Sequence, residues 1–200
     1  MDHEQWEQAP QIFVDTQIIT LFKFLETPEK FWPEGATQGR FVITTPIVCE
    51  LEAIKDEHYS SGQRKRAKML LDYLEDADDS PRKRKILSGE TCLEYYWPES
   101  NDITRAGNRF RVHGPDERFI AAIMDASGGS QSKYYVLSDD VGIRLRCKHI
   151  LASSQKLLKA YKPPQELRYP AEVFNLPQNV KLAVKQLGLE LAEAMREEEG

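Results

Sequence analysis

The feature that most limits how this chain can fold is the alternation of short apolar runs with amphipathic stretches. Runs rich in β-branched and aromatic residues predict strands at 11–14, 41–45, 91–97 and 133–138, with a last edge strand at 149–152. Between them, apolar residues recur at helical spacing and predict helices at 16–25, 46–57, 62–75, 115–124 and 141–147. Strands that alternate with helices form βαβ units, in which crossover helices join parallel strands. The sequence therefore predicts an α/β fold, a Rossmann-like α/β/α sandwich with a mostly parallel central sheet.

The chain divides by composition near residue 161. Its 200 residues suit one domain with an appendage, and its content of apolar residues (40%) and charged residues (30%) is typical of globular proteins. Residues 163–178 carry four prolines, and residues 180–199 read as a helix with a very acidic end. We therefore expect one α/β domain at 1–161, followed by a proline-rich arm and an acidic helix at 162–200.

Cysteines, hydropathy and charge indicate the cellular compartment and the kind of surface to expect. Cys49, Cys92 and Cys147 are scattered and form no CxxC pair, so free thiols in a reducing compartment are expected. The apolar runs are too short to span a bilayer, and the acidic start is unlike a secretory signal. We expect a cytoplasmic protein, with the nucleus left open by the short basic run at 82–85. The net charge of −5 argues against a surface that binds nucleic acid everywhere, but it permits local basic patches.

Acidic residues recur at the ends of the predicted strands. Asp15 directly follows the run IFV, and Asp139 and Asp140 follow YYVLS. Asp116 lies in the first turn of the helix before that last strand, and Glu50 lies one turn into the helix after FVITT. In a parallel sheet with right-handed crossovers, the carboxyl ends of the strands share one rim, where such folds bind ligands. We therefore expect these carboxylates to converge.

Converging carboxylates raise one another's pKa unless a cation lies among them. Mg²⁺ or Mn²⁺ is the expected cation, since hard cations prefer oxygen ligands. Each acid also has a structural explanation: Asp116 and Asp140 suit helix N-termini, and Glu50 suits an ion pair with Lys55. Asp15 is harder to explain in this way, because a carboxylate that ends a buried parallel strand is costly without a partner. The joint pattern favours a metal site.

Four segments carry a family resemblance. In chain order they are IFVDT, TTPIVCELEAIK, GPDERFIAAIM and YYVLSDDVGIRLRCK, and together they resemble the PIN-domain family over about residues 10–152. That family has an Asp after the first strand, a Glu in an apolar-x-E-L helix, an Asp opening a later helix, and [ST]-x-D before a short helix. This sequence departs from the pattern at Gln17, where the family usually carries Asn, Ser or Thr, and in larger stretches at 31–40 and 75–89.

The resemblance implies that the domain expected at 1–161 is a PIN-like nuclease domain, a metal-dependent endoribonuclease that hydrolyses phosphodiester bonds of single-stranded RNA with Mg²⁺ or Mn²⁺. Its catalytic acids fall on Asp15, Glu50, Asp116 and Asp140. The three aspartates are the expected main metal ligands, with Asp139 beside them, and Glu50 either ligates the metal or positions water. Thr16 and Ser138 are accessory polar positions, and Ser138 is expected to hydrogen-bond a carboxylate or a phosphate.

Two basic runs are candidate contacts to an RNA backbone: 63–68, which begins a helix, and 82–85, which is expected to lie in a loop. The individual contacts expected are Arg64, Lys65, Arg66, Lys68 and Arg144. Solvated surface charge is the structural alternative, and Arg144 also stands four residues after Asp140, where a helix ion pair forms. Residues 95–97, Tyr-Tyr-Trp, either stack on bases or, as the strand pattern favours, pack in the core.

A second class of function stays open beside the nuclease. A catalytically idle PIN-like module would bind RNA or a partner protein through the rim, the arm and the C-terminal helix. Gln17 and the extended tail favour this alternative, whereas the complete set of acids favours catalysis. The C-terminal segment also suits a homodimer contact. A phosphohydrolase of the haloacid-dehalogenase kind would need an Asp at position 17, and no glycine-rich phosphate loop is present.

Overall fold

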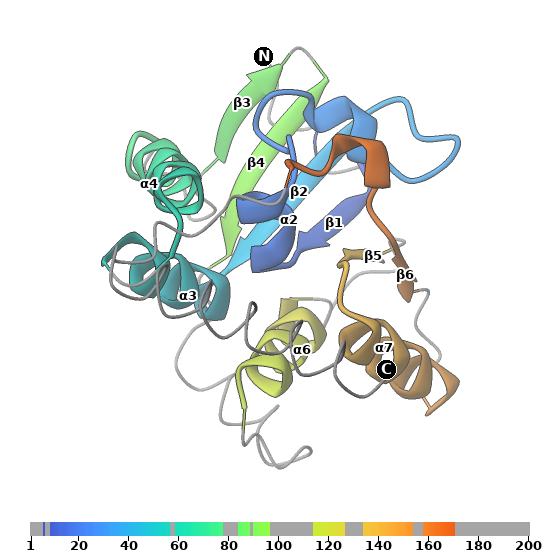
Figure 1. Cartoon of the computed structure of the whole chain (residues 1–200). Coiled ribbons are helices and arrows are strands. Elements are labelled where there is room, and N and C mark those ends of the chain that lie inside the picture. The colour runs from blue at the N-terminus through green and yellow to red at the C-terminus, as the bar shows by residue number, and fades with distance from the viewer. Residues whose placement is uncertain are drawn as a thin grey trace, which may run out of the picture. The chain divides into compact units, whose positions relative to one another are not determined.

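A computed structural model of the chain describes residues 6, 9–56, 59–77, 84–88, 90–96, 114–126, 134–153 and 158–170. The strands in these residues are β1 Gln11–Val14, β2 Gly39–Thr44, β3 Arg84–Ser88, β4 Thr91–Tyr96, β5 Tyr134–Leu137 and β6 Leu158–Tyr161. They form a six-stranded sheet of order β3-β4-β2-β1-β5-β6 (Figure 1). Every neighbouring pair is parallel except the antiparallel edge pair of β3 and β4. The predicted α/β fold with a mostly parallel sheet is confirmed.

Helices connect the parallel strands. The described helices are α2 Thr16–Leu21, α3 Thr45–Asp56, α4 Ser61–Glu75, α6 Pro115–Ala126 and α7 Val141–Ser153, with 3₁₀ turns at Pro28–Phe31 and Gln165–Leu167. The chain runs from β1 to β2, then to β3 at the edge of the sheet and back to β4, and it returns to the other side of β1 for β5 and β6. Right-handed crossovers therefore place α2, α3 and α4 on one face and α6 and α7 on the other. In the structure α4 packs on α2 and α3, and α6 packs on α7 and also contacts α3 (Figure 1).

The core lies on both sides of the central strand β1. All four residues of β1 are buried, because strands lie on both of its edges and helices cover the sheet. Beside it, the rings of Phe24, Phe31 and Phe41 pack edge to face, with centroids 4.8 and 5.6 Å apart. The sheet also holds a buried ion pair, in which Arg40 Nη1 of β2 lies 3.3 Å from Glu94 Oε2 of β4 and each side chain is 1% exposed.

Two predicted helix ends are wrong. The helix expected at 16–25 ends at Leu21, because Phe22 turns extended (φ −123°, ψ 160°) and forms an antiparallel bridge with Arg168. The helix expected at 141–147 continues to Ser153, so the edge strand expected at 149–152 is helical. A short apolar run fits either structure, and here it continues a helix already under way. The edge strand on that side of the sheet is β6 instead.

The basic run at 82–85 contributes to a strand that the sequence pattern does not indicate. Residues Arg84–Ser88 pair antiparallel with β4, whereas a loop was the expectation. Edge strands tolerate charged residues because one side faces solvent, so the strand lacks the apolar alternation that marks inner strands.

The first residues of the expected arm pack against the domain. Lys23 N donates to Leu167 O, and Tyr169 N donates to Leu21 O, both at 2.9 Å. By its internal contacts the chain divides into Met1–Pro170 and Ala171–Gly200. The acidic helix expected at 180–199 and Trp97 lie outside the described residues. None of the helices described is both long and apolar enough to cross a membrane.

Candidate metal centre

The strand order reverses beside β1, and the candidate acids gather at this point. The neighbours β1 and β5 are parallel, and Asp15 N donates to Leu137 O at 3.1 Å, so the ladder continues to the residue after β1. Ser138, Asp139 and Asp140 follow β5 directly. In open α/β sheets, ligands bind in the crevice beyond the carboxyl ends of the strands, where the order reverses.

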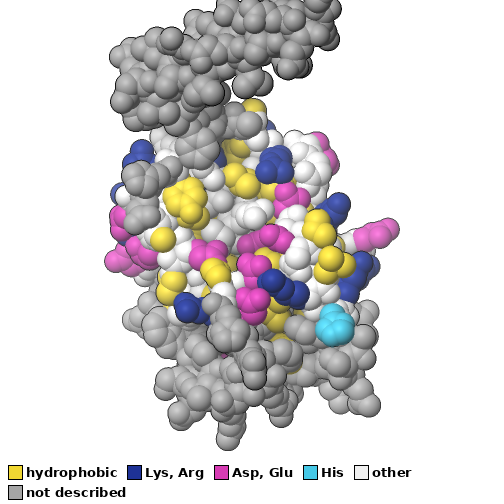
Figure 2. Space-filling model, turned by 60° about the horizontal axis from the view of Figure 1, so that its bottom comes forward, with side chains coloured by type: hydrophobic (Ala, Val, Ile, Leu, Met, Phe, Trp, Pro, Cys, Tyr) yellow, Lys and Arg dark blue, Asp and Glu magenta, His cyan; other side chains and the backbone are white. Residues whose placement is uncertain are grey.

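A cavity of about 660 Å³ opens at this place. Its lining contains the four acids predicted as catalytic, Asp15, Glu50, Asp116 and Asp140. They come from the β1–α2 junction, from α3, from α6 and from the start of α7, so segments distant in sequence meet here. Acidic side chains lie near the middle of the face shown in Figure 2, with Lys and Arg side chains close by.

Asp15 is the most buried of these acids, with 5% of its surface exposed. Ser138 Oγ donates a hydrogen bond of 2.7 Å to Asp15 Oδ2. Burial raises the pKa of Asp15 to about 6, and the nearby charges of Glu50 and Asp140 add to the rise. The hydrogen bonds from Ser138 and from the backbone of Gln17 act in the opposite direction. A carboxylate in this position is stabilised by any cation that reaches it.

Glu50 is held in a similar way from α3. Thr16 Oγ1 donates a short hydrogen bond to Glu50 Oε2. Burial raises the pKa of Glu50 and the charge of Asp116 adds to it, whereas the bond from Thr16 lowers it. The hydroxyls of Thr16 and Ser138, predicted as accessory groups, therefore each orient one carboxylate of the cavity.

Asp140 caps the N-terminus of α7. Its Oδ1 accepts from the backbone N–H of Gly142 and, at 3.2 Å, of Ile143. Gly142 leaves room for this cap, since a Cβ there would lie 3.0 Å from Oδ1. Asp140 N in turn donates to Ser138 Oγ at 3.0 Å, so this hydroxyl joins Asp140 to Asp15. The capping bonds engage only Oδ1, and among the described residues no hydrogen bond reaches Oδ2.

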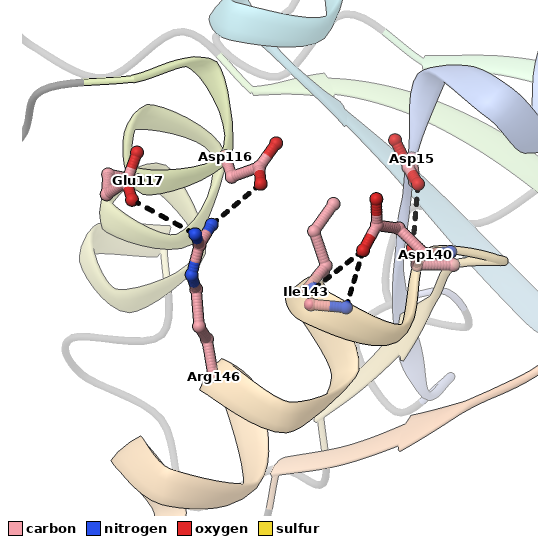
Figure 3. A network of polar contacts seen from close by, with 8 residues as sticks. Asp15, Asp116, Glu117, Asp140, Ile143 and Arg146 are labelled. Carbon is pink, nitrogen blue, oxygen red and sulfur yellow. Dashed lines mark hydrogen bonds and ion pairs between the residues drawn. The ribbon is translucent and has the colours of Figure 1, made fainter.

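Asp116 faces a cation of the protein itself. Arg146 Nη1 of α7 lies 2.6 Å from Asp116 Oδ2, and Arg146 Nη2 lies 3.4 Å from Glu117 Oε1 (Figure 3). The side chains of Asp116 and Arg146 are 41% and 45% exposed, so solvent screens this pair. Asp116 lines the cavity, and its charge is balanced by that of Arg146.

Asp139, also predicted as a metal ligand, is absent from the cavity lining. Its Oδ1 accepts from Gln165 Nε2 and its Oδ2 accepts from Arg168 Nη1, both at 3.0 Å. Asp139 thus anchors the segment after β6, while its neighbour Asp140 faces the cavity. Sequence alone does not separate two adjacent aspartates that point in different directions.

The donor chemistry suits a hard divalent cation, but the side chains do not form a closed cage. Within the described part of the chain, no three His, Cys, Asp or Glu side chains come close enough together to hold a metal ion. Mg²⁺ needs no such group, because it usually keeps several waters and is held through one or two carboxylates. Asp15 and Asp140, joined through Ser138, are the pair that fits this mode. Glu50 and Asp116 line the same cavity.

The predicted nucleic-acid contacts fall into two groups. Arg64, Lys65 and Lys68 are exposed on α4, outside the cavity lining. Arg66 is half-buried: its Nε donates to Thr20 O at 2.7 Å, and its guanidinium lies 4.1 Å from the centroid of the Tyr169 ring.

Arg144 is 8% exposed, and its Nη1 donates to Ser138 O at 2.7 Å rather than pairing with Asp140. Like Arg66, it holds the protein's own backbone.

Other residues reach the cavity without having been predicted. Arg168, Tyr59 and Gln63 line it, as does Gln17, the residue that departs from the family pattern. Tyr59 is 43% exposed. Of the aromatic residues considered for base stacking, Tyr95 is half-buried on β4, and Tyr96 donates its hydroxyl to Asp125 at 3.0 Å. None of these residues directly follows a strand. The expectation that residues at the carboxyl ends of parallel strands converge on one rim therefore does not identify them.

Comparison of the sequence with protein-family models and with curated proteins gives no match. The fold, the cavity and the chemistry of its lining are therefore the observations that bear on function.

Proposed function

We propose that this protein is a PIN-like nuclease that uses Mg²⁺ or Mn²⁺ to hydrolyse phosphodiester bonds of single-stranded RNA. One observation carries the proposal: four carboxylates from four separate elements line one cavity where the strand order reverses. Structural roles explain single members of this set, but they do not explain why all four face the same space. The choice of RNA rests on the resemblance in sequence.

Asp15 and Asp140 would hold the metal. A divalent ion there would polarise a non-bridging phosphate oxygen and lower the pKa of bound water. Ser138 supports both residues, because its hydroxyl donates to the Asp15 carboxylate and accepts from the backbone N–H of Asp140. Arg144 in turn holds the backbone of Ser138. This support keeps the two ligands oriented before substrate arrives.

Glu50 is the candidate proton acceptor. Thr16 occupies its Oε2, so Oε1 is the atom that would take a proton from an attacking water. Its pKa is raised toward neutral pH, and a general base works best when its pKa lies near the working pH. Asp116 would add a further negative charge to the cavity once Arg146 releases it.

The alternative is a catalytically idle module that binds RNA or a partner protein. It is favoured by the pairing of Asp116 with Arg146 and by the absence, among the described residues, of three acids close enough to enclose a metal.

The experiment that tests the proposal compares cleavage of labelled single-stranded RNA and DNA with Mg²⁺, Mn²⁺ or chelator. Asp140→Asn keeps an N-cap acceptor but removes a ligand charge, so we expect at least about a hundredfold loss of cleavage without loss of the fold. Asp72→Asn, an exposed aspartate of α4 outside the cavity, is the matched control and should cleave like the parent.

The outcomes separate the two functions. Equal cleavage by the parent and Asp140→Asn would remove Asp140 from the site. A parent protein that binds RNA but cleaves no substrate under any metal condition would favour the idle module instead.

A further inference from the structure

Arg168 is the one basic residue among the described residues that line the cavity. It lies in the segment after β6, seven residues beyond the end of that strand. The four carboxylates of the lining repel any anionic ligand, so a cation on the same wall changes what the cavity accepts. The position of Arg168 therefore bears on substrate binding rather than on metal binding.

The backbone around Arg168 is fixed by main-chain hydrogen bonds. Phe22 and Arg168 form an antiparallel bridge just beyond the end of α2. On either side of it, Lys23 N donates to Leu167 O and Tyr169 N donates to Leu21 O, each at 2.9 Å. The segment that carries Arg168 is thus tied to the element that follows Asp15, and the guanidinium starts from a defined position.

The side chain of Arg168 is oriented from two directions. Its Nη1 donates to Asp139 Oδ2 at 3.0 Å, and its guanidinium carbon lies 5.5 Å from the centroid of the Phe22 ring. Asp139 is itself held by Gln165 through the other oxygen. An arginine fixed in this way loses little side-chain entropy when a ligand arrives.

The ion pair with Asp139 leaves most of the guanidinium available. An arginine has five N–H donors, and in the described residues Asp139 accepts from Nη1 alone. The side chain of Arg168 is 46% exposed, so the pair by itself adds little to stability. A planar guanidinium with free donors at the wall of a cavity matches the two oxygens of a phosphate group.

We propose that Arg168 binds a backbone phosphate of single-stranded nucleic acid that enters the cavity. This inference rests on the proposed nuclease function and adds a residue to its substrate-binding surface. The segment 162–170 thereby serves as part of the binding wall, with Asp139 as the residue that positions Arg168. The carboxylates and Arg168 then act on different phosphate groups of the same nucleic-acid strand.

The test measures binding of a fluorescein-labelled single-stranded RNA oligonucleotide to the full chain by anisotropy, over a series of salt concentrations. Binding is followed in chelator and in Mg²⁺, and a gel checks that the probe stays intact. For Arg168→Gln we expect about tenfold weaker binding at low salt. The slope of log K against log salt should also fall in magnitude by about 0.7, the value for one phosphate contact on a single strand.

Two further variants make the readout specific. Arg168→Lys keeps the charge and should keep the salt slope, although it loses the planar contact. Arg118→Gln removes an exposed arginine of α6 outside the cavity lining and should leave affinity and slope unchanged. Melting temperatures of all variants should stay near that of the parent, because an exposed ion pair contributes little.

The results distinguish this inference from the function on which it rests. An Arg168→Gln protein with the affinity and slope of the parent overturns the role of Arg168, whether or not the parent cleaves RNA. A slope that is reduced for Arg168→Gln, when the parent binds RNA but cleaves nothing, supports the role of Arg168 while overturning the nuclease. A parent that binds no RNA in either condition overturns both.

Discussion

Replacing Asp15 with Asn should make the metal-free protein more stable at neutral pH. Asp15 is 5% exposed, and burial raises its pKa from the ordinary 3.8 to about 6. The folded protein therefore holds this proton more tightly than the unfolded chain does. The charge on Asp15 costs no stability below pH 3.8, a growing amount between pH 3.8 and 6, and the full amount above pH 6. Asn carries no charge at any pH and keeps an oxygen that accepts from Ser138.

The size of the effect follows from the pKa. A tenfold change in proton affinity is about 1.4 kcal/mol, so a rise from 3.8 to about 6 corresponds to a cost of about 3 kcal/mol at neutral pH. For a chain of this length, each kcal/mol moves the melting temperature by about 2–4 °C. In chelator at pH 7, Asp15→Asn should therefore melt about 6–12 °C above the parent. At pH 4 the difference should nearly vanish.

Thermal unfolding followed by circular dichroism measures both quantities, with Asp72→Asn as the exposed control that should not move. Mg²⁺ provides the second arm: it should raise the melting temperature of the parent, because a bound ligand stabilises the folded state, and should raise that of Asp15→Asn much less. An Asp15→Asn protein that melts at or below the parent at pH 7 in chelator would refute the reasoning. That result would mean that neighbouring groups already compensate the buried charge.

Two further predictions concern the charged pairs. Arg40→Met should destabilise the protein by about 3–5 kcal/mol in denaturant unfolding, because Glu94, which is 1% exposed, loses its ion pair with Arg40. The double variant Arg40→Met, Glu94→Leu should recover much of that stability. Arg146→Gln should lower the Mg²⁺ concentration that gives half of the thermal stabilisation by about two- to fivefold, because it releases Asp116 from an exposed ion pair. An unchanged half-stabilising concentration would show that Asp116 takes no part in metal binding.

The apolar periodicity predicts the inner elements of the fold well. The strands β1, β2, β4 and β5 and the helices α3, α4 and α6 lie within a few residues of their expected ranges, because burial imposes the pattern that the sequence carries. The errors occur where other contacts decide. The helix after Asp15 stops at Leu21 because residues 167–169 pair with the chain there, and this pairing is invisible in the local sequence.

The same division holds for the candidate site. The four acids were expected to share one rim because strand ends of a parallel sheet do so, and they line one cavity. Local pattern does not reveal that Asp139 turns toward Gln165 and Arg168, nor that Arg168 reaches the wall from a proline-rich stretch. These placements depend on how the chain after β6 folds back, a contact between segments far apart in sequence.

Ser138 shows why the structural and catalytic explanations of these acids are not exclusive. Its hydroxyl donates to Asp15 and accepts from Asp140 N, while Asp140 Oδ1 caps α7. The ends of two strands and the start of one helix are therefore joined by the same few hydrogen bonds that orient the two carboxylates. The cap uses only one carboxylate oxygen of Asp140, so a residue that begins a helix in an ordinary way also lines the cavity. The reversal of strand order creates the crevice. The hydrogen bonds beyond the ends of β1 and β5 fix Asp15 and Asp140 beside it.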